Sequence, residues 1–149
     1  MKIIKQILLA LLFIAILLPV GYIATFMLIC PIINNNKASS IEKELSKITL
    51  PPDTEIIETS SYVGNTSGTG NHVEILAGIL IRTKLKEEEI FKYFNDYEIV
   101  FSVPAEEGQY TEQCYYLKFS YLNKNSDKTG CYIIANYYEP ITQCDIRGY

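Results

Sequence analysis

Few of the residue types that commonly perform catalysis occur in this chain, and they are widely spaced. His72 is the single histidine. A nucleophilic thiol from Cys114 or Cys131 would need a base such as His72 beside it, and nothing in the spacing of these residues brings them together. The histidine and the cysteines have the ligand types of a zinc site, but they lack the closely spaced ligand pair that is typical of one. The sequence therefore predicts no catalytic residue, no metal site and no cofactor.

Two other stretches suggest chemistry without requiring it. Gly64–Asn71 is rich in glycine, but it lacks the lysine of a phosphate-binding loop and precedes a predicted strand, so it predicts a hairpin connection. Glu87–Glu89 stands where a helix is predicted to begin, and the positive end of a helix favours such charges. The adjacent Glu106 and Glu107 give no indication of the carboxylate separation that glycoside hydrolysis needs. We expect all of these carboxylates to be solvated.

Tyrosine is the residue type that most suggests binding. Of the 12 tyrosines, most lie from Tyr93 onward. The predicted strands place Tyr116, Tyr132 and Tyr138 on the sheet face opposite Phe119. Such amphipathic rings are common in recognition surfaces, so these three residues predict a binding surface. The alternative is that they cover sheet edges and pack with loops and with the helix that follows the apolar run.

The cysteines divide between the N-terminal apolar stretch and the rest of the chain. Cys30 ends that stretch, whereas Cys114, Cys131 and Cys144 follow it and cannot all pair within one monomer. Alternation along the last two predicted strands points Cys114 away from the face that carries Cys131, which disfavours a bridge between them. We predict a disulfide between Cys131 and Cys144, with Cys114 to Cys144 as a less favoured pairing. Buried reduced thiols are the alternative to any bridge.

The element that positions everything else is an uncharged run between Lys5 and Lys37, most apolar from Ile7 to Ile29. As a helix, residues 7–29 would be roughly 35 Å long, which is enough to cross the hydrocarbon core of a bilayer. Pro19 predicts a kink within it. Residues 1–33 are therefore predicted to form a transmembrane anchor that contacts the lipid bilayer through residues 7–29.

Two alternatives to an uncleaved anchor concern the end of this run. A secretory signal cleaved after Ala24 would need a small residue two positions earlier, and a lipid-modified Cys30 would need one in place of Ile29. Lys2 and Lys5 precede the run, which predicts a cytoplasmic N-terminus. The expected location is the cell membrane, as a single-pass protein with its C-terminal domain outside.

The remaining residues predict a short helix followed by one domain. Residues 34–49 contain the capping-box pattern of Ser39 and Glu42 and predict a short amphipathic connecting helix. Residues 50–149 predict an extracytoplasmic α+β domain: an antiparallel sheet of five or six strands with one packed helix, in two layers. The expected strands are 54–63, 73–82, 98–103, 113–122 and 130–138, with a possible edge strand at 144–148, and the expected helix is 87–95.

Charge limits the class of partner. The chain has 13 basic and 17 acidic residues; without Lys2 and Lys5, the predicted exported part has 11 basic and 17 acidic residues. This acidic balance argues against nucleic acid as a partner. The leading hypothesis is a membrane-tethered binding or interaction domain with a protein partner in the cell envelope. The alternatives are a membrane-anchored hydrolase and a purely structural accessory subunit.

Part of the sequence resembles a known group. Leu50–Glu55, the turn that ends at Gly70 and Asn71, and the run from Gly78 into Glu87–Ile90 resemble a group of uncharacterised, membrane-anchored bacterial proteins. The likeness covers roughly residues 50–97 and includes no functional motif. No activity is established for that group. The resemblance therefore implies a bacterial cell-envelope setting and nothing catalytic.

Overall fold

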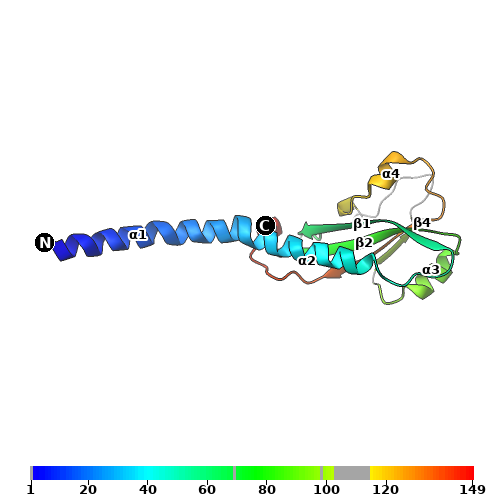
Figure 1. The fold of residues 1–149 in the computed structure, drawn as a ribbon, viewed down its shortest axis with the longest axis horizontal. Helices are drawn as coiled ribbons and strands as arrows, with labels where there is room; N and C mark the ends of the chain where they lie inside the picture. The colour runs from blue at the N-terminus through cyan, green and yellow to red at the C-terminus, as the bar shows by residue number, and fades with distance from the viewer. Residues whose placement is uncertain (1, 69, 98, 103–114) are drawn as a thin grey trace.

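The computed structural model describes residues 2–68, 70–97, 99–102 and 115–149. Its longest element is a helix that runs from Lys2 to Leu45 without interruption. It consists of α1 (Lys2–Ala24), a π-helical turn, η1 (Thr25–Ile29), and α2 (Cys30–Leu45). In Figure 1, α1 projects away from the rest of the molecule, α2 lies along the sheet, and the C-terminus lies beside the junction between them.

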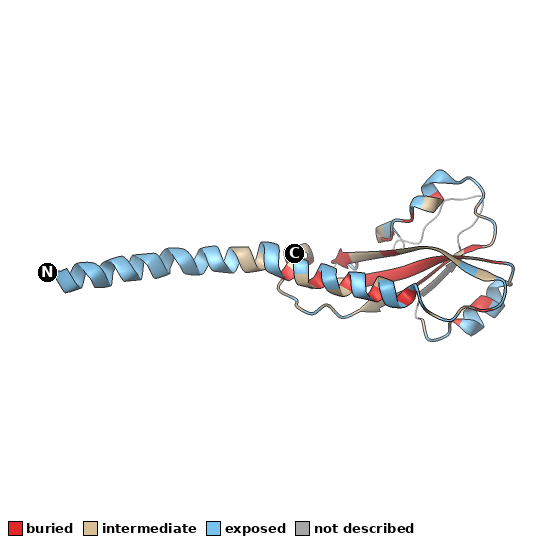
Figure 2. Cartoon of the chain, in the orientation of Figure 1, coloured by how far each residue is buried: buried red, intermediate tan, exposed pale blue. Residues whose placement is uncertain are grey.

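The projecting part of this helix, α1, contributes no residue to a hydrophobic core. None of the residues of α1 is buried, and Figure 2 shows α1 as an exposed rod. Its side chains are almost all apolar, so in water this surface would be unfavourable. The helix is long and apolar enough to be a membrane span or a signal sequence.

The connecting helix predicted for residues 34–49 is not a separate element, because α2 continues α1 through the predicted boundary. Ser39 therefore lies inside a helix and caps nothing, and the Glu42 carboxylate instead accepts a hydrogen bond from Ser61. The predicted amphipathic face is confirmed, since Ile41 and Leu45 are buried. The buried residues of α2 recur every three or four positions, which keeps one stripe of the helix against the sheet. They are Cys30, Asn34, Ala38, Ile41 and Leu45.

The irregular turn of the long helix lies after α1. The α-helix continues through Pro19, where a kink was expected, and the wider π turn occupies Thr25–Ile29. In this turn the Cys30 N–H donates to the Thr25 carbonyl, five residues back. We attribute it to Pro31, which has no N–H and whose ring would clash with the carbonyl four residues earlier in a regular α-helix.

In the part of the chain that the structure describes, the sheet has four strands in the order β1-β2-β4-β3, and every neighbouring pair is antiparallel. The strands are β1 (Thr54–Gly64), β2 (Glu74–Thr83), β3 (Ile99–Ser102) and β4 (Cys131–Tyr138). The prediction that β2 is central is confirmed, because β1 and β4 flank it and its residues from Ile75 to Ile81 are buried on both faces. The predicted hairpin connection between β1 and β2 is confirmed as well.

Both faces of the sheet are covered. One face packs against α2 and against α3 (Glu87–Tyr93), whose Ile90 is fully buried. At the start of α3, the Glu89 carboxylate accepts the Lys86 N–H at 2.9 Å. The other face is covered by residues 115–124, with Leu117 and Phe119 buried against it. The predicted two layers with one helix are therefore incomplete, since a second helix and a further covering segment take part.

The strand predicted for residues 113–122 is wrong. Residues 120–124 form a short helix, α4 (Ser120–Lys124), and residue 113 lies outside the described residues. Side chains of β1 satisfy the backbone donors of this segment: the Glu58 carboxylate accepts the Tyr121 N–H at 2.9 Å, and the Ser60 hydroxyl accepts the Lys118 N–H at 3.0 Å. Leu117 and Phe119 do pack with the β4 residues expected to face them, but from a covering layer instead of a paired strand.

The predicted edge strand at residues 144–148 is also wrong. The tail contains a 3-10 turn, η3 (Ile146–Gly148), and no described residue of it pairs in the sheet. The tail lies instead against the start of α2, where its polar groups find partners in side chains.

Candidate functional site

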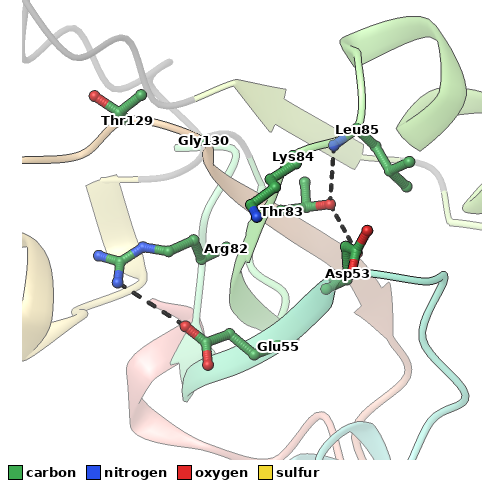
Figure 3. Close-up of a pocket in the computed structure, with 9 residues that line it drawn as sticks. Asp53, Glu55, Arg82, Thr83, Lys84, Leu85, Thr129 and Gly130 are labelled. Atoms are coloured by element: carbon green, nitrogen blue, oxygen red, sulfur yellow. Dashed lines mark hydrogen bonds and ion pairs between the residues drawn. The ribbon is translucent and has the colours of Figure 1, made fainter.

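A groove opens at the end of the sheet farthest from α1, where β1 begins, β2 ends and β4 begins (Figures 1 and 3). Its volume is about 800 Å³. We call it the far-end groove, and its lining is mostly polar, with carboxylates, cations and hydroxyls. The lining residues are Asp53, Thr54, Glu55, Arg82, Thr83, Lys84, Leu85, Thr129 and Gly130.

The floor of the far-end groove is held by close backbone contacts. Gly130 has φ 69°, and a Cβ at this position would lie 2.4 Å from the Thr83 carbonyl oxygen, so only glycine fits without rearrangement. The Thr83 N–H donates to the Gly130 carbonyl at 3.0 Å. The hydroxyl oxygens of Thr83 and Thr54 are 2.8 Å apart, and the Leu85 N–H donates to the Thr83 hydroxyl at 3.2 Å. These bonds join β1, β2 and β4 into one fixed surface.

The two cationic side chains of the groove, Arg82 and Lys84, differ in the contacts that they make. The Arg82 guanidinium lies 3.9 Å from the Glu55 carboxylate, donates to the Tyr121 hydroxyl and lies 5.1 Å from the centre of the Tyr121 ring. Lys84 is exposed, and within the described ranges its ammonium group has no hydrogen bond or ion pair. The groove thus presents one positive charge that no described side chain neutralises.

Cys131 lies beside the groove and is not arranged as a nucleophile. It pairs with Arg82 across the sheet and is 1% exposed. Burial raises the pKa of the Cys131 thiol, and this outweighs the hydrogen bond with Arg82 that lowers it. A raised pKa disfavours the reactive thiolate. His72 precedes β2 at the opposite end, roughly 25 Å away at the rise of a strand, so this histidine cannot serve Cys131 as a base.

His72 does contact a hydroxyl and a carboxylate. Its Nε2 atom lies 3.0 Å from Glu74 Oε1 and 3.4 Å from Ser67 Oγ. In a hydrolytic triad the carboxylate holds one ring nitrogen and the nucleophile the other, whereas here both approach the same nitrogen. The Glu74 carboxylate also accepts a hydrogen bond from Thr66. This arrangement gives no support to the hydrolase alternative.

The structure does not bring the three predicted binding tyrosines together. Tyr132 and Tyr138 pack at the face that carries α2 and α3, whereas Tyr116 packs at the opposite face. All three are half-buried, and the Tyr116 ring lies 4.7 Å from that of Tyr62. Burial raises the pKa of Tyr132 and of Tyr138. They therefore contribute to packing on two separate faces and do not form one surface.

The end of the sheet nearest α1 is closed by polar contacts between α2 and the tail. Asn34 is fully buried; its amide donates to the Thr142 carbonyl at 2.9 Å and to the Asp145 carboxylate at 3.0 Å. Its side-chain oxygen accepts the N–H groups of Ile141 and Thr142 at 3.1 and 3.2 Å. Arg147 donates to the Asp145 carboxylate at 2.7 Å. We call Asn34, Asp145 and Arg147 the helix–tail clasp.

The helix–tail clasp supplies hydrogen bonds to a buried carboxylate, that of Asp145. The Asp145 side chain has no exposed surface, and burial by itself raises its pKa. Hydrogen bonds from Arg147 and Asn34 outweigh this effect, so the pKa of Asp145 lies below its ordinary value. Arg147 continues to α2, donating to the Asn35 side chain at 2.6 Å and to the Pro31 carbonyl at 3.2 Å. The bonds of Asn34 and the bonds from Arg147 to Asn35 and Pro31 hold the tail on α2, whereas the Arg147–Asp145 bonds lie within the tail.

The predicted disulfide between Cys131 and Cys144 is incompatible with this placement. Cys131 pairs with Arg82 near the end of β2. Cys144 follows Gln143, whose side chain exchanges two hydrogen bonds with the backbone of Val73, just before β2 begins. The two thiols thus lie near opposite ends of a strand. Cys114, Glu106 and Glu107 lie outside the described residues.

Sequence reasoning missed both ends of the domain. The sequence does not single out Asn34, and only its spacing of four from Ala38 and seven from Ile41 indicates a buried position. Asp145 and Arg147 had no local signal for their place against the helix, because their partners in α2 are more than 100 residues away. Among the described residues, no three histidine, cysteine or carboxylate side chains converge as metal ligands would. Comparisons found no matching family model, no similar curated protein and no similar solved structure.

Proposed function

We propose that this chain is a single-pass membrane protein that presents a binding domain outside the cell to another protein of the envelope. Lys2 and Lys5 precede the apolar run of the long helix, whereas the other end of that run is followed by Asn34–Asn36 and Lys37. This asymmetry favours an N-terminus that stays inside. The acidic balance of the remaining residues favours a polypeptide partner over nucleic acid.

The continuity of the long helix supports an uncleaved anchor. The cleavage position after Ala24 lies between α1 and η1, inside helical structure. Just beyond it, the Phe26 ring lies 5.4 Å from the ring of Tyr149, so the helix contacts the last residue of the domain there. The cleavage position thus lies within a continuous helix, close to its contact with the tail.

The far-end groove carries the proposal for binding. The helix–tail clasp occupies the end of the domain nearest the anchor, so the opposite end is the one that points away from the bilayer (Figure 1). There the groove presents the hydrogen-bonded hydroxyls of Thr54 and Thr83 and the carboxylates of Asp53 and Glu55. It also presents the ammonium group of Lys84, which has no ion pair among the described residues. A lining with both signs of charge suits a polar polypeptide segment, in which carboxylates, amines and amides alternate.

The orientation is tested by labelling intact cells with a membrane-impermeant maleimide. Ser126→Cys places a thiol on an exposed loop of the domain, and Lys5→Cys places one at the N-terminal end of α1. Labelling above that of the parent chain is expected for Ser126→Cys in intact cells, and for Lys5→Cys only after lysis. The reverse pattern would refute the proposed orientation, and a mature chain that begins after Ala24 would refute the anchor.

Binding is tested with a photo-crosslinking amino acid at Lys84, with Lys124 as the matched control. Both lysines are exposed, but Lys124 lies in α4 and does not line the groove. A discrete protein adduct is expected from position 84 and not from position 124. Lys84→Glu should abolish an adduct formed from a neighbouring groove position, Thr129, while Lys124→Glu leaves it unchanged. Equal crosslinking at positions 84 and 124 would contradict a role for the groove.

A further inference from the structure

The helix–tail contact brings together two cysteines that are far apart in the sequence. Cys30 is the first residue of α2 and is 5% exposed, and Cys144 lies in the tail and is half-buried. The Thr142 hydroxyl oxygen lies 4.0 Å from Cys30 Sγ and 3.1 Å from the Cys144 backbone nitrogen. These two distances place the Cys144 nitrogen no more than about 7 Å from Cys30 Sγ. The Cys30 thiol is also close enough to raise the pKa of the Cys144 thiol.

The surroundings of this pair hold it in place. Asn34 lies four residues after Cys30. Its side chain donates to the carbonyl of Thr142, accepts the N–H of Thr142 and donates to the carboxylate of Asp145, the residue after Cys144. Gln143 fixes the tail to the start of β2 through two hydrogen bonds with Val73. These contacts anchor the backbone close to both thiols, and a disulfide needs the two Cβ atoms to come within about 4.5 Å of each other.

We propose that Cys30 and Cys144 form a disulfide that locks the C-terminal tail to the anchor helix at the membrane surface. This rests on the proposed function, because the pair lies at the outer end of the apolar helix only in that orientation. Exported domains meet oxidising conditions in which such bonds persist. The other buried cysteine among the described residues, Cys131, lies at the far end of the sheet and takes no part.

The bond needs an oxidant, which is the disulfide of a thiol–disulfide exchange protein or a small-molecule disulfide. The half-buried Cys144 thiolate attacks one sulfur of that disulfide and forms a mixed disulfide, releasing one thiol. The Cys30 thiolate then attacks Cys144 Sγ and releases the second thiol. In sum, two cysteine thiols lose two protons and two electrons, and the donor disulfide gains them. A hydrogen bond with Cys30 raises the pKa of the Cys144 thiol, so the first attack is slow at neutral pH.

The geometry is tested on the purified full-length protein in detergent micelles. Oxidised glutathione at about pH 8.5 is added, free thiols are blocked with an alkylating reagent, and proteolytic peptides are mapped without reduction. We expect a mass decrease of about 2 Da and a peptide pair that joins Cys30 to Cys144. Cys30→Ser and Cys144→Ser should each abolish this pair, whereas Cys131→Ser should leave it. A Cys131–Cys144 link, or full alkylation of both thiols in folded wild-type protein, would overturn the proposal.

The same peptide mapping is then done on whole cells that are quenched with acid and alkylated. It separates the disulfide proposal from the proposed orientation of the chain in the membrane. A Cys30–Cys144 peptide from cells supports the disulfide in the exported protein. A bond that forms in purified protein but is absent from cells overturns the disulfide in the cell, and the maleimide labelling then shows whether the proposed orientation has failed as well. Because the wild-type chain is mapped directly, the result does not depend on the folding of the serine variants.

Discussion

Replacing Asn34 by alanine removes four hydrogen bonds from a side chain that has no exposed surface. A neutral hydrogen bond contributes about 1 kcal/mol net and one to an ionised group about 2 kcal/mol, which sets a ceiling of about 5 kcal/mol. The tail lies at the end of the chain and can leave the helix and rehydrate, which lowers the cost. We expect Asn34→Ala to reduce the free energy of unfolding by about 2–3 kcal/mol.

The measurement is urea unfolding of the full-length protein in detergent micelles, combined with hydrogen exchange of the tail. Asn36→Ala is the matched control, because Asn36 is the same residue type two positions on and is exposed. Exchange of residues 141–147 should accelerate at least tenfold in Asn34→Ala and remain unchanged in Asn36→Ala. If both variants unfold at the same urea concentration and exchange alike, the clasp does not hold the tail and the reasoning is refuted.

Three further predictions concern other contacts. Because the pKa of Asp145 is lowered in the folded state, its contribution to stability is present above its unfolded pKa of about 4 and is lost as pH falls below it; acid titration of Asp145→Asn should lack that loss. Gly78→Ala should cost about 1–3 kcal/mol in urea unfolding, since a Cβ there would lie 2.7 Å from a carbonyl oxygen of β4. Glu58→Ala should cost about 1 kcal/mol and speed hydrogen exchange of α4, whereas Glu139→Ala, at an exposed glutamate after β4, should leave α4 unchanged.

The spacing of neighbouring residues was sufficient to predict those elements whose own residues show a clear periodicity. The alternating apolar residues of β2 predicted a strand buried on both faces, and the structure has it between β1 and β4. Glu87–Glu89 predicted the start of α3, and Ile90 its buried face. The apolar run predicted a transmembrane helix over residues 7–29, and the structure has a helix there that is long and apolar enough to be a membrane span. In each case the periodicity extends over enough residues to distinguish helix from strand.

Local pattern failed where a distant residue decides the structure. Residues 117–122 alternate like a strand, but the Glu58 carboxylate and the Ser60 hydroxyl of β1 accept their backbone donors and allow a covering segment with a short helix. Ser39 and Glu42 form a capping pattern, yet a stripe of buried residues through Asn34 and Ala38 keeps the helix continuous there. A capping preference of about 1 kcal/mol cannot outweigh burial of a whole helical face.

The sequence by itself determined a single long apolar helix, a central doubly buried strand and the helix that begins at Glu87, because each depends on the spacing of neighbouring residues. Only the tertiary structure decided which cysteines are neighbours, which tyrosines share a face and why Asp145 is buried. Those facts depend on contacts between segments far apart in the sequence, such as the bond from Asn34 to Asp145, and no local spacing encodes them.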